Sequence, residues 1–111
     1  MDPTAEELIA RLRRHPDDAA AYAALRAHYQ RIGDWASLAN LLEGWARRSP
    51  DHGGAAQAYF EAGELAWGAL SDRARGTKLY ESALERNPMH TEAGHRLQAL
   101  LEEAGDVRRL A

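Results

Sequence analysis

Five histidines are the side chains of this 111-residue chain best suited to binding a metal ion, namely His15, His28, His52, His90 and His95. A zinc site needs three or four ligands that converge, often from positions i and i+4 of one helix. His90 and His95 are five residues apart and do not share a helix face, and the other three lie in separate segments. The spacing therefore does not predict a metal site, and no cofactor is expected.

Three pairs of neighbouring carboxylates could supply a general acid and a general base: Glu6-Glu7, Asp17-Asp18 and Glu102-Glu103. Neighbouring residues on a helix point about 100° apart, so this spacing does not form a catalytic dyad. Asp17-Asp18 stands where a helix is expected to begin, and a carboxylate there caps free N–H groups. Nucleophile elbows and phosphate-binding loops are missing, and the absence of cysteine excludes thiolate chemistry. The chain is predicted not to be an enzyme.

Charge and hydropathy exclude further classes of function. The net charge is −3, with acids and bases interspersed, so a basic face for nucleic acid is not expected. No apolar run approaches the 18 residues of a membrane span, and the opening residues MDPTAEEL lack the apolar segment of a secretory signal. A cytoplasmic protein without membrane contact is the expectation.

The elements that must carry these side chains are helices, because alanine, leucine, arginine and glutamate dominate while β-branched residues are scarce. Pro16, Pro50 and Pro88 each follow a helical pattern, at intervals of 34 and 38 residues. Between and after them stand Gly33-Asp34, Ser71-Asp72 and Gly105-Asp106, which predict corners where one helix ends and the next is capped. The expected helices lie near 4–14, 18–32, 35–48, 55–70, 73–86 and 90–104, with a truncated seventh from about 107.

One apolar stripe recurs with the same helical spacing of i, i+3, i+7 and i+10. Its three copies are Tyr22, Leu25, Tyr29 and Ile32, then Phe60, Gly63, Trp67 and Leu70, then Gly94, Leu97, Leu101 and Ala104. The same supersecondary unit is therefore expected three times along the chain.

This pattern resembles the tetratricopeptide repeat family, whose 34-residue unit is a helix–turn–helix pair. The first repeat matches with Tyr22, Leu25, Tyr29, Gly33, Asp34, Trp35, Leu42 and Pro50; the second with Phe60, Trp67, Asp72, Tyr80, Ala83 and Pro88; the third with Leu97, Leu101, Gly105 and Asp106. The resemblance implies an all-α fold, a right-handed superhelix of antiparallel helix pairs with about six helices plus the truncated seventh. It implies one domain over 1–111, divided into a capping half repeat at 4–16, repeats at 17–50 and 51–88, and a truncated repeat at 89–111.

The repeats are degenerate at two positions where the paired helices of the family come closest. The position that is normally small holds Arg26, Glu64 and Gln98, and the position that is normally alanine holds Leu38, Gly76 and Leu110. Wider helix pairs are expected as a result. An alternative alignment that puts Gly63 at the small position breaks the shared stripe. Four extra residues, Asp51 to Gly54, are expected to form a surface loop, which a partner could also contact.

The resemblance also implies a concave groove lined by the first helix of each unit. The corresponding candidate residues are Ala20, Ala23, Ala27 and Gln30, then Ala58, Glu61, Leu65 and Gly68, then Glu92, His95, Ala99 and Glu102. The groove changes from small and apolar to acidic, which suits bulky side chains or a helix at one end and a basic or polar ligand at the other.

These features predict a protein–protein interaction scaffold that binds a peptide or a helix of an unidentified protein. The alternative is a structural or assembly module that associates end-on with itself or with neighbouring repeats. RNA binding is disfavoured because the groove lacks arginines and aromatic stacking platforms. Because the third unit lacks most of its second helix, the chain is expected either to belong to a longer repeat protein or to pair weakly with itself through its C-terminal end.

Overall fold

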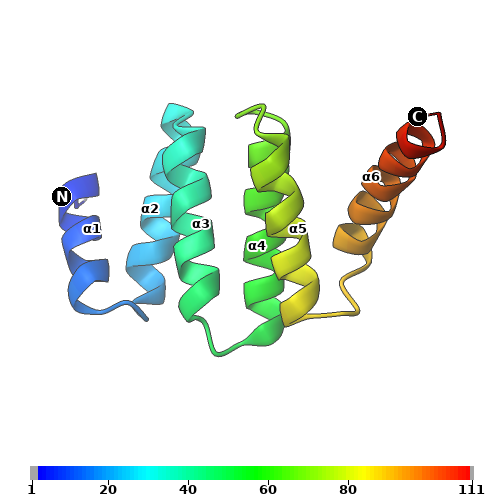
Figure 1. The fold of residues 1–111 in the computed structure, drawn as a ribbon. Coiled ribbons are helices and arrows are strands. Elements are labelled where there is room, and N and C mark those ends of the chain that lie inside the picture. The colour runs from blue at the N-terminus through cyan, green and yellow to red at the C-terminus, as the bar shows by residue number, and fades with distance from the viewer. Residues whose placement is uncertain (1–2, 111) are drawn as a thin grey trace.

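The computed structural model describes residues 3–110, with the side chains of residues 3–103, and all regular structure in that range is helical. Its six helices are α1 (Ala5–Arg14), α2 (Ala19–Ile32), α3 (Trp35–Arg48), α4 (His52–Trp67), α5 (Arg73–Arg86) and α6 (Thr91–Leu110). Figure 1 shows them side by side in chain order, with consecutive helices antiparallel, in a body of 58 × 28 × 18 Å. The expected all-α class is confirmed.

Four helices begin at a threonine or aspartate side chain that accepts a hydrogen bond from the first helical turn. The donor and acceptor pairs are Glu7 N–H to Thr4 (3.1 Å), Ala21 N–H to Asp18 (3.0 Å), Ser37 N–H to Asp34 (3.2 Å) and Arg75 N–H to Asp72 (3.1 Å). These caps satisfy N–H groups that have no acceptor within their own helix. The predicted helix starts after Thr4, Asp18, Asp34 and Asp72 are therefore confirmed.

The corner between α2 and α3 is closed by Gly33, whose φ of 71° is left-handed. The Asp34 N–H donates to the Tyr29 carbonyl at 3.0 Å, and the Gly33 N–H donates to the Gln30 carbonyl at 3.3 Å. This pair of bonds satisfies the last carbonyls of α2 in a Schellman arrangement. Glycine adopts the conformation without steric cost, as the sequence predicts.

The corner between α4 and α5 is longer and is built differently. Helix α4 ends at Trp67, and the turn that follows places Ser71 at a φ of 51°. The Leu70 N–H donates to the Leu65 carbonyl at 3.0 Å, and the Asp72 N–H donates to the Ala66 carbonyl at 2.7 Å. A serine therefore holds the left-handed position that a glycine holds in the first corner, at a steric cost.

The predicted loop at Asp51 to Gly54 is wrong, because the residues from His52 onward form the first turn of α4. The Asp51 N–H donates to the Ser49 hydroxyl at 3.2 Å, which turns the chain directly after Pro50. The Ala55 N–H then donates to the Asp51 carbonyl at 2.9 Å, so Gly53 and Gly54 already lie inside the helix. The extra residues lengthen α4 at its start, and α4 ends earlier than predicted.

The predicted turn at Gly105-Asp106 and the truncated seventh helix are also wrong. The backbone of α6 is helical without a break from Thr91 to Leu110. A glycine inside a helix costs only about 1 kcal/mol relative to alanine. That cost is too small to end a helix by itself.

The core lies mainly between α3 and α4. Leu38, Leu42 and Ala46 of α3 pack against an alanine stripe on α4 formed by Ala55, Ala58, Ala62 and Ala66. Smaller clusters flank it: Leu8, Ala21 and Leu25 join α1 to α2, and Ala56, Phe60, Tyr80, Ala83 and Ala93 join α4 to α5 and α6. Alanines allow the helix backbones to approach closely, so one small-residue helix is packed on several sides.

The guanidinium of Arg86, at the end of α5, fastens the corner between α3 and α4. It donates to the carbonyls of Ala46 at 2.8 Å and Ser49 at 2.6 Å, and to the His52 Nδ1 at 3.0 Å. Both carbonyls belong to the C-terminal end of α3, where a cation also complements the helix dipole. Three helices are therefore joined through one side chain.

Helices α4 and α5 share the most extensive contact of the described chain, and the contact between α2 and α3 is much smaller. The expectation of wide helix pairs stays a prediction for α2 and α3, which carry Arg26 and Leu38. The expectation of a wide pair is wrong for α4 and α5, which pack closely where Gly63 meets Gly76. The alternative alignment, with Gly63 rather than Glu64 as the small residue, describes that contact correctly.

Candidate functional site

The α2 part of the predicted groove is accessible. Ala20, Ala23, Ala27 and Gln30 are all exposed, and their spacing places them on one face of the helix. Leu25 and Tyr29 lie on the opposite face, where they are buried or half-buried. Helix α2 therefore presents a smooth, alanine-rich surface to solvent and directs its large side chains inward.

Most residues in the α4 part of the predicted groove are engaged in contacts within the protein. Glu61 forms an ion pair with Arg26 of α2 and also accepts a hydrogen bond from Gln57 at 3.4 Å. Leu65 is half-buried and packs against the central core. Ala58 is only 5% exposed and belongs to the α3–α4 contact, so its expected place in the groove is wrong. Gly68 lies beyond the end of α4.

The α6 part consists of Glu92, His95, Ala99 and Glu102, all exposed, with Glu102 accepting a hydrogen bond from Gln98 at 3.3 Å. Within residues 3–110, the Glu61–Arg26 ion pair joins α4 to α2, and a cluster of Ala56, Phe60 and Ala93 joins α4 to α6. The ten remaining candidate residues are spread over these three helices, and none of them lines either of the two clefts described below. A ligand-binding groove at these residues stays a prediction.

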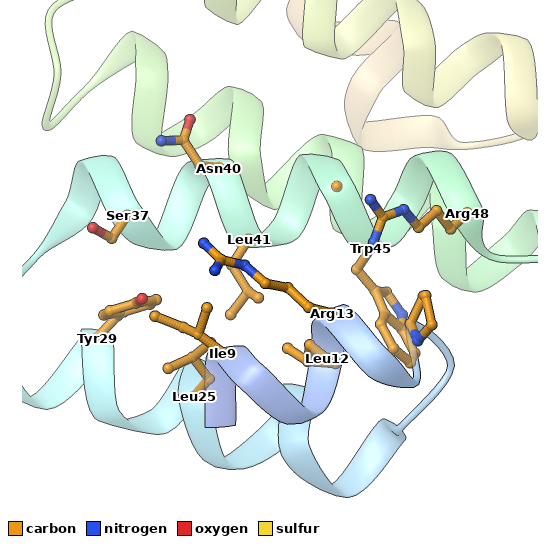
Figure 2. Close-up of a pocket in the computed structure, with 12 residues that line it drawn as sticks. Ile9, Leu12, Arg13, Leu25, Tyr29, Ser37, Asn40, Leu41, Trp45 and Arg48 are labelled. Atoms are coloured by element: carbon orange, nitrogen blue, oxygen red, sulfur yellow. The ribbon is translucent and has the colours of Figure 1, made fainter. Parts of the chain in front are cut away.

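A cleft of about 620 Å³ opens instead between α1, α2 and α3 (Figure 2). Its lining residues are Ile9, Leu12, Arg13, Pro16, Leu25, Tyr29, Ser37, Asn40, Leu41, Gly44, Trp45 and Arg48. Most of the surface is apolar, and polar side chains stand at the rim. We call this site the α1–α3 cleft.

The sequence of α3 explains why one wall of the α1–α3 cleft is continuous. Ser37, Asn40, Leu41, Gly44, Trp45 and Arg48 follow at helical spacing and share one face. Gly44 has no heavy atom within 4 Å of where a Cβ would stand, so its missing side chain leaves space in the wall. The ring of Trp45 stacks on Tyr22 at 4.2 Å between centroids, with an interplanar angle of 10°. The aromatic end of the cleft is held in place by this stack.

Two arginines give the α1–α3 cleft its charge. Arg13 and Arg48 form no ion pair with a described carboxylate, whereas their neighbours Arg11 and Arg47 pair with Asp18 at 3.0 Å and Glu43 at 2.8 Å. Figure 2 shows Arg13 extending across the cleft from α1 and Arg48 beyond Trp45 on α3. An apolar surface with two available guanidinium groups is suited to a ligand that combines apolar and acidic groups.

Sequence reasoning missed this cleft because the helical spacing of α3 does not show which of its large side chains lack a packing partner. A signal was present in α3, where Gly44 interrupts a run of large residues on one face. A glycine at that place, without a turn to explain it, indicates missing volume in the packing. The cleft also needs α1, which the sequence analysis treated only as a cap.

A second cleft of about 440 Å³ lies between α5 and α6, at the end of α4. It is lined by Trp67, Arg73, Ala74, Thr77, Glu81, Leu97, Leu100 and Leu101. The guanidinium of Arg73 stands 4.8 Å from the centre of the Trp67 ring in a cation–π arrangement. We call this site the α5–α6 cleft.

Glu64 joins three helices beside the α5–α6 cleft. It accepts hydrogen bonds from the Tyr80 hydroxyl at 2.9 Å and from Arg96 Nε at 2.7 Å. Burial raises the pKa of Glu64, but the bonds from Arg96 and Tyr80 lower that pKa by more, so it lies below its usual range. Burial and the Glu64 carboxylate raise the pKa of Tyr80 to about 12. This buried group stays protonated and donates at neutral pH.

His90 and His52 form hydrogen bonds within the fold. The His90 Nδ1 accepts a hydrogen bond from the Ala93 N–H at 3.2 Å, which caps α6, and its Nε2 pairs with Gln57 at 2.9 Å. His52 accepts from Arg86. Among the described residues, no group of three or more metal-binding side chains comes together. No described helix is long and apolar enough to cross a membrane.

A scan against protein-family models finds no match for this chain, and a search of curated proteins likewise finds none. The two clefts are therefore interpreted from their own residues and geometry.

Proposed function

We propose that this chain is a protein–protein interaction scaffold of the tetratricopeptide-repeat type, which binds a peptide or a helix of a partner protein. The helix pairs, the Gly33-Asp34 corner and the recurring apolar stripe support a right-handed superhelix of antiparallel helix pairs over one domain. The degenerate positions and the different α4–α5 corner are departures from that pattern.

The observation that carries the proposal is the α1–α3 cleft, an apolar trough bordered by Arg13 and Arg48, neither of which pairs with a carboxylate among residues 3–103. The partner segment would place apolar side chains in the trough and acidic side chains near the two guanidinium groups. A helix with apolar residues at i, i+4 and i+7 and a flanking glutamate or aspartate has this chemistry. The exposed alanine face of Ala20, Ala23 and Ala27 is the second place where such a helix could dock.

Gly44 allows a direct test of the cleft, because a side chain added there enters open space. Gly44→Phe should fill the cleft without a clash in the fold, and Gly94→Phe is a matched control in α6, where the Cβ also meets nothing within 4 Å. The experiment is affinity capture from a lysate, followed by titration of the captured protein against each purified variant. The wild type and Gly94→Phe should bind alike, and Gly44→Phe should bind at least tenfold more weakly.

Ala27→Arg distinguishes between the two candidate surfaces. It adds bulk and charge to the exposed alanine face of α2, which points away from the α1–α3 cleft. If Ala27→Arg abolishes binding while Gly44→Phe does not, the predicted groove is the site and the α1–α3 cleft is not. Equal affinity of both variants and the wild type, with unchanged melting curves, would exclude both surfaces.

A structural or assembly role is the second candidate, and the α5–α6 cleft favours it. The cleft lies at one end of the row of helices and exposes Leu101 to 70% of its full accessibility. Apolar surface of this kind commonly marks a contact with another protein chain.

A further inference from the structure

We propose that the α5–α6 cleft is a self-association surface, at which two copies of this chain pair about a two-fold axis that passes close to Thr77. The pairing is antiparallel, so that α5 of one copy faces α5 of the other in the opposite direction. It uses helices that do not line the α1–α3 cleft, so it is independent of the proposed peptide binding.

The apolar part of this surface is contributed by both helices and by the end of α4. Leu97 and Leu100 are half-buried, Leu101 is 70% exposed, and Trp67 forms the wall at the α4 end. An open groove next to a projecting leucine is self-complementary in shape, because Leu101 of each copy can enter the groove of the other. Burying these side chains stabilises association at roughly 25 cal/mol per Å² of apolar surface removed from water.

The charges on α5 indicate what covers the groove. Arg73, Thr77 and Glu81 follow at i, i+4 and i+8 on one stripe of the helix, with the two charged residues about 12 Å apart along the axis. Among the described side chains, Arg73 forms no ion pair, and Glu81 forms neither an ion pair nor a hydrogen bond. A cation and a carboxylate are thus held at equal distances on either side of Thr77.

A two-fold axis at Thr77 exchanges the two ends of this stripe. Arg73 of one copy then faces Glu81 of the second copy, and the same pair forms again on the other side of the axis. A dimer of this type uses one surface patch twice, so each complementary contact is made twice. A parallel arrangement would instead place like charges together.

A head-to-tail arrangement, in which α1 of a second copy covers the α5–α6 cleft, fits the surfaces less well. The outward face of α1 carries Glu6, Glu7, Arg11 and Arg14, all exposed, and its apolar residues Leu8, Ile9 and Leu12 face α2 and the α1–α3 cleft. Packing that charged face on Leu97 and Leu101 would remove its charges from water, and among them only Arg11 has a described ion-pair partner, Asp18. The closed dimer is therefore favoured over an open chain of copies.

Sedimentation equilibrium of the full chain over a range of concentrations, with charge-reversal variants, tests the proposal. Arg73→Glu or Glu81→Arg alone should raise the dissociation constant of the dimer at least about tenfold, because each change puts two pairs of like charges face to face. The double variant Arg73→Glu/Glu81→Arg restores opposite charges and should return the constant to within about threefold of the wild type. The matched control Lys78→Glu reverses an exposed charge of α5 outside the cleft and should leave the dissociation constant unchanged.

Three outcomes would overturn the proposal. The first is a chain that stays monomeric at every concentration, with circular dichroism showing that it is folded. The second is a double variant as weak as the single variants, which would mean that Arg73 does not face Glu81. The third is a mass that grows without a plateau, which would indicate head-to-tail association. Because the peptide cleft is formed by other helices, none of these outcomes affects the test with Gly44→Phe.

Discussion

Gly63 of α4 and Gly76 of α5 lie against each other where the two helices pack closely. A Cβ on Gly76 would stand 3.3 Å from the Gly63 carbonyl oxygen, and a Cβ on Gly63 would stand 2.8 Å from two ring atoms of Tyr80. The ring of Tyr80 is fully buried and its hydroxyl is bound to Glu64, so it has little room to move. This pair of glycines sets the spacing of the most extensive helix contact in the molecule.

Gly63→Ala should destabilise the protein, and Gly44→Ala should stabilise it. Both substitutions gain about 1 kcal/mol of helix propensity. Only the first forces Tyr80 to shift, which costs about 1–3 kcal/mol as in other overpacked cores. Denaturant melts of the two variants provide the measurement. Equal stabilisation by both would show that α4 and α5 are not packed as closely as Gly63 and Gly76 indicate.

Substitutions at the left-handed residues of the two corners, Gly33 and Ser71, should change the free energy of unfolding in opposite directions. Gly33→Val should lower the free energy of unfolding by about 1–2 kcal/mol or more, because a β-branched residue is strained at a φ of 71°. Ser71→Gly should raise it by up to about 1 kcal/mol, because glycine relieves the strain at a φ of 51°. Thermal melts followed by circular dichroism are sufficient to check both. An unchanged midpoint for Gly33→Val would contradict the Schellman corner.

Asp34→Ala should destabilise the protein at neutral pH and lose this effect in acid. The Ser37 hydroxyl donates to Asp34 at 2.7 Å and the Ser37 N–H at 3.2 Å, and these bonds hold the pKa of Asp34 below its ordinary value of 3.8. A lowered pKa contributes stability above the ordinary value, and that contribution is lost as the pH falls through the pKa of the folded state. Urea melts between pH 2 and 7 should show the wild type and the variant converging at the acid end. A gap that stays constant with pH would mean that the cap does not involve the charged carboxylate.

Tyr80→Phe should lower the free energy of unfolding by about 1.5–3 kcal/mol at pH 7, because it removes a hydrogen bond to a charged group. The wild type should then lose stability as the pH rises from about 10 toward 12. The raised pKa of Tyr80, about 12, means that folding favours the protonated phenol, so this contribution is complete only below the ordinary value of 10.0. The gap between the two proteins should narrow over that range in alkaline urea melts. A gap that widens above pH 10 would contradict the assigned bond between Tyr80 and Glu64.

The sequence predicts those parts of the fold that depend on local chemistry. Asp18, Asp34 and Asp72 cap helices and Gly33 ends one, as expected, because each makes its bonds within a few residues of the chain. The failures concern positions where tertiary packing decides. The glycines after His52 look like a loop in the sequence, yet they lie in a helix whose alanine stripe is buried along its length.

The candidate site shows the same division. The helical spacing of Ala20, Ala23 and Ala27 correctly predicts one exposed face of α2, since that property follows from helix geometry. The sequence could not predict that Glu61 pairs with Arg26, because this depends on how far apart α2 and α4 stand. The α1–α3 cleft depends on the positions of three helices and on the volume missing at Gly44, and no spacing along the chain encodes it.

The bonds of Arg86 have a consequence for the order in which the chain becomes structured during synthesis. Its acceptors at Ala46, Ser49 and His52 precede it by 40, 37 and 34 residues. Because translation proceeds from the N-terminus, α3 and the corner after it are made long before the side chain that fastens them. Until α5 has been translated, the junction of α3 and α4 depends on the packing of Leu38, Leu42 and Ala46 against the alanine stripe of α4. The completion of α5 therefore adds the last hydrogen bonds to a junction whose apolar contacts can form earlier.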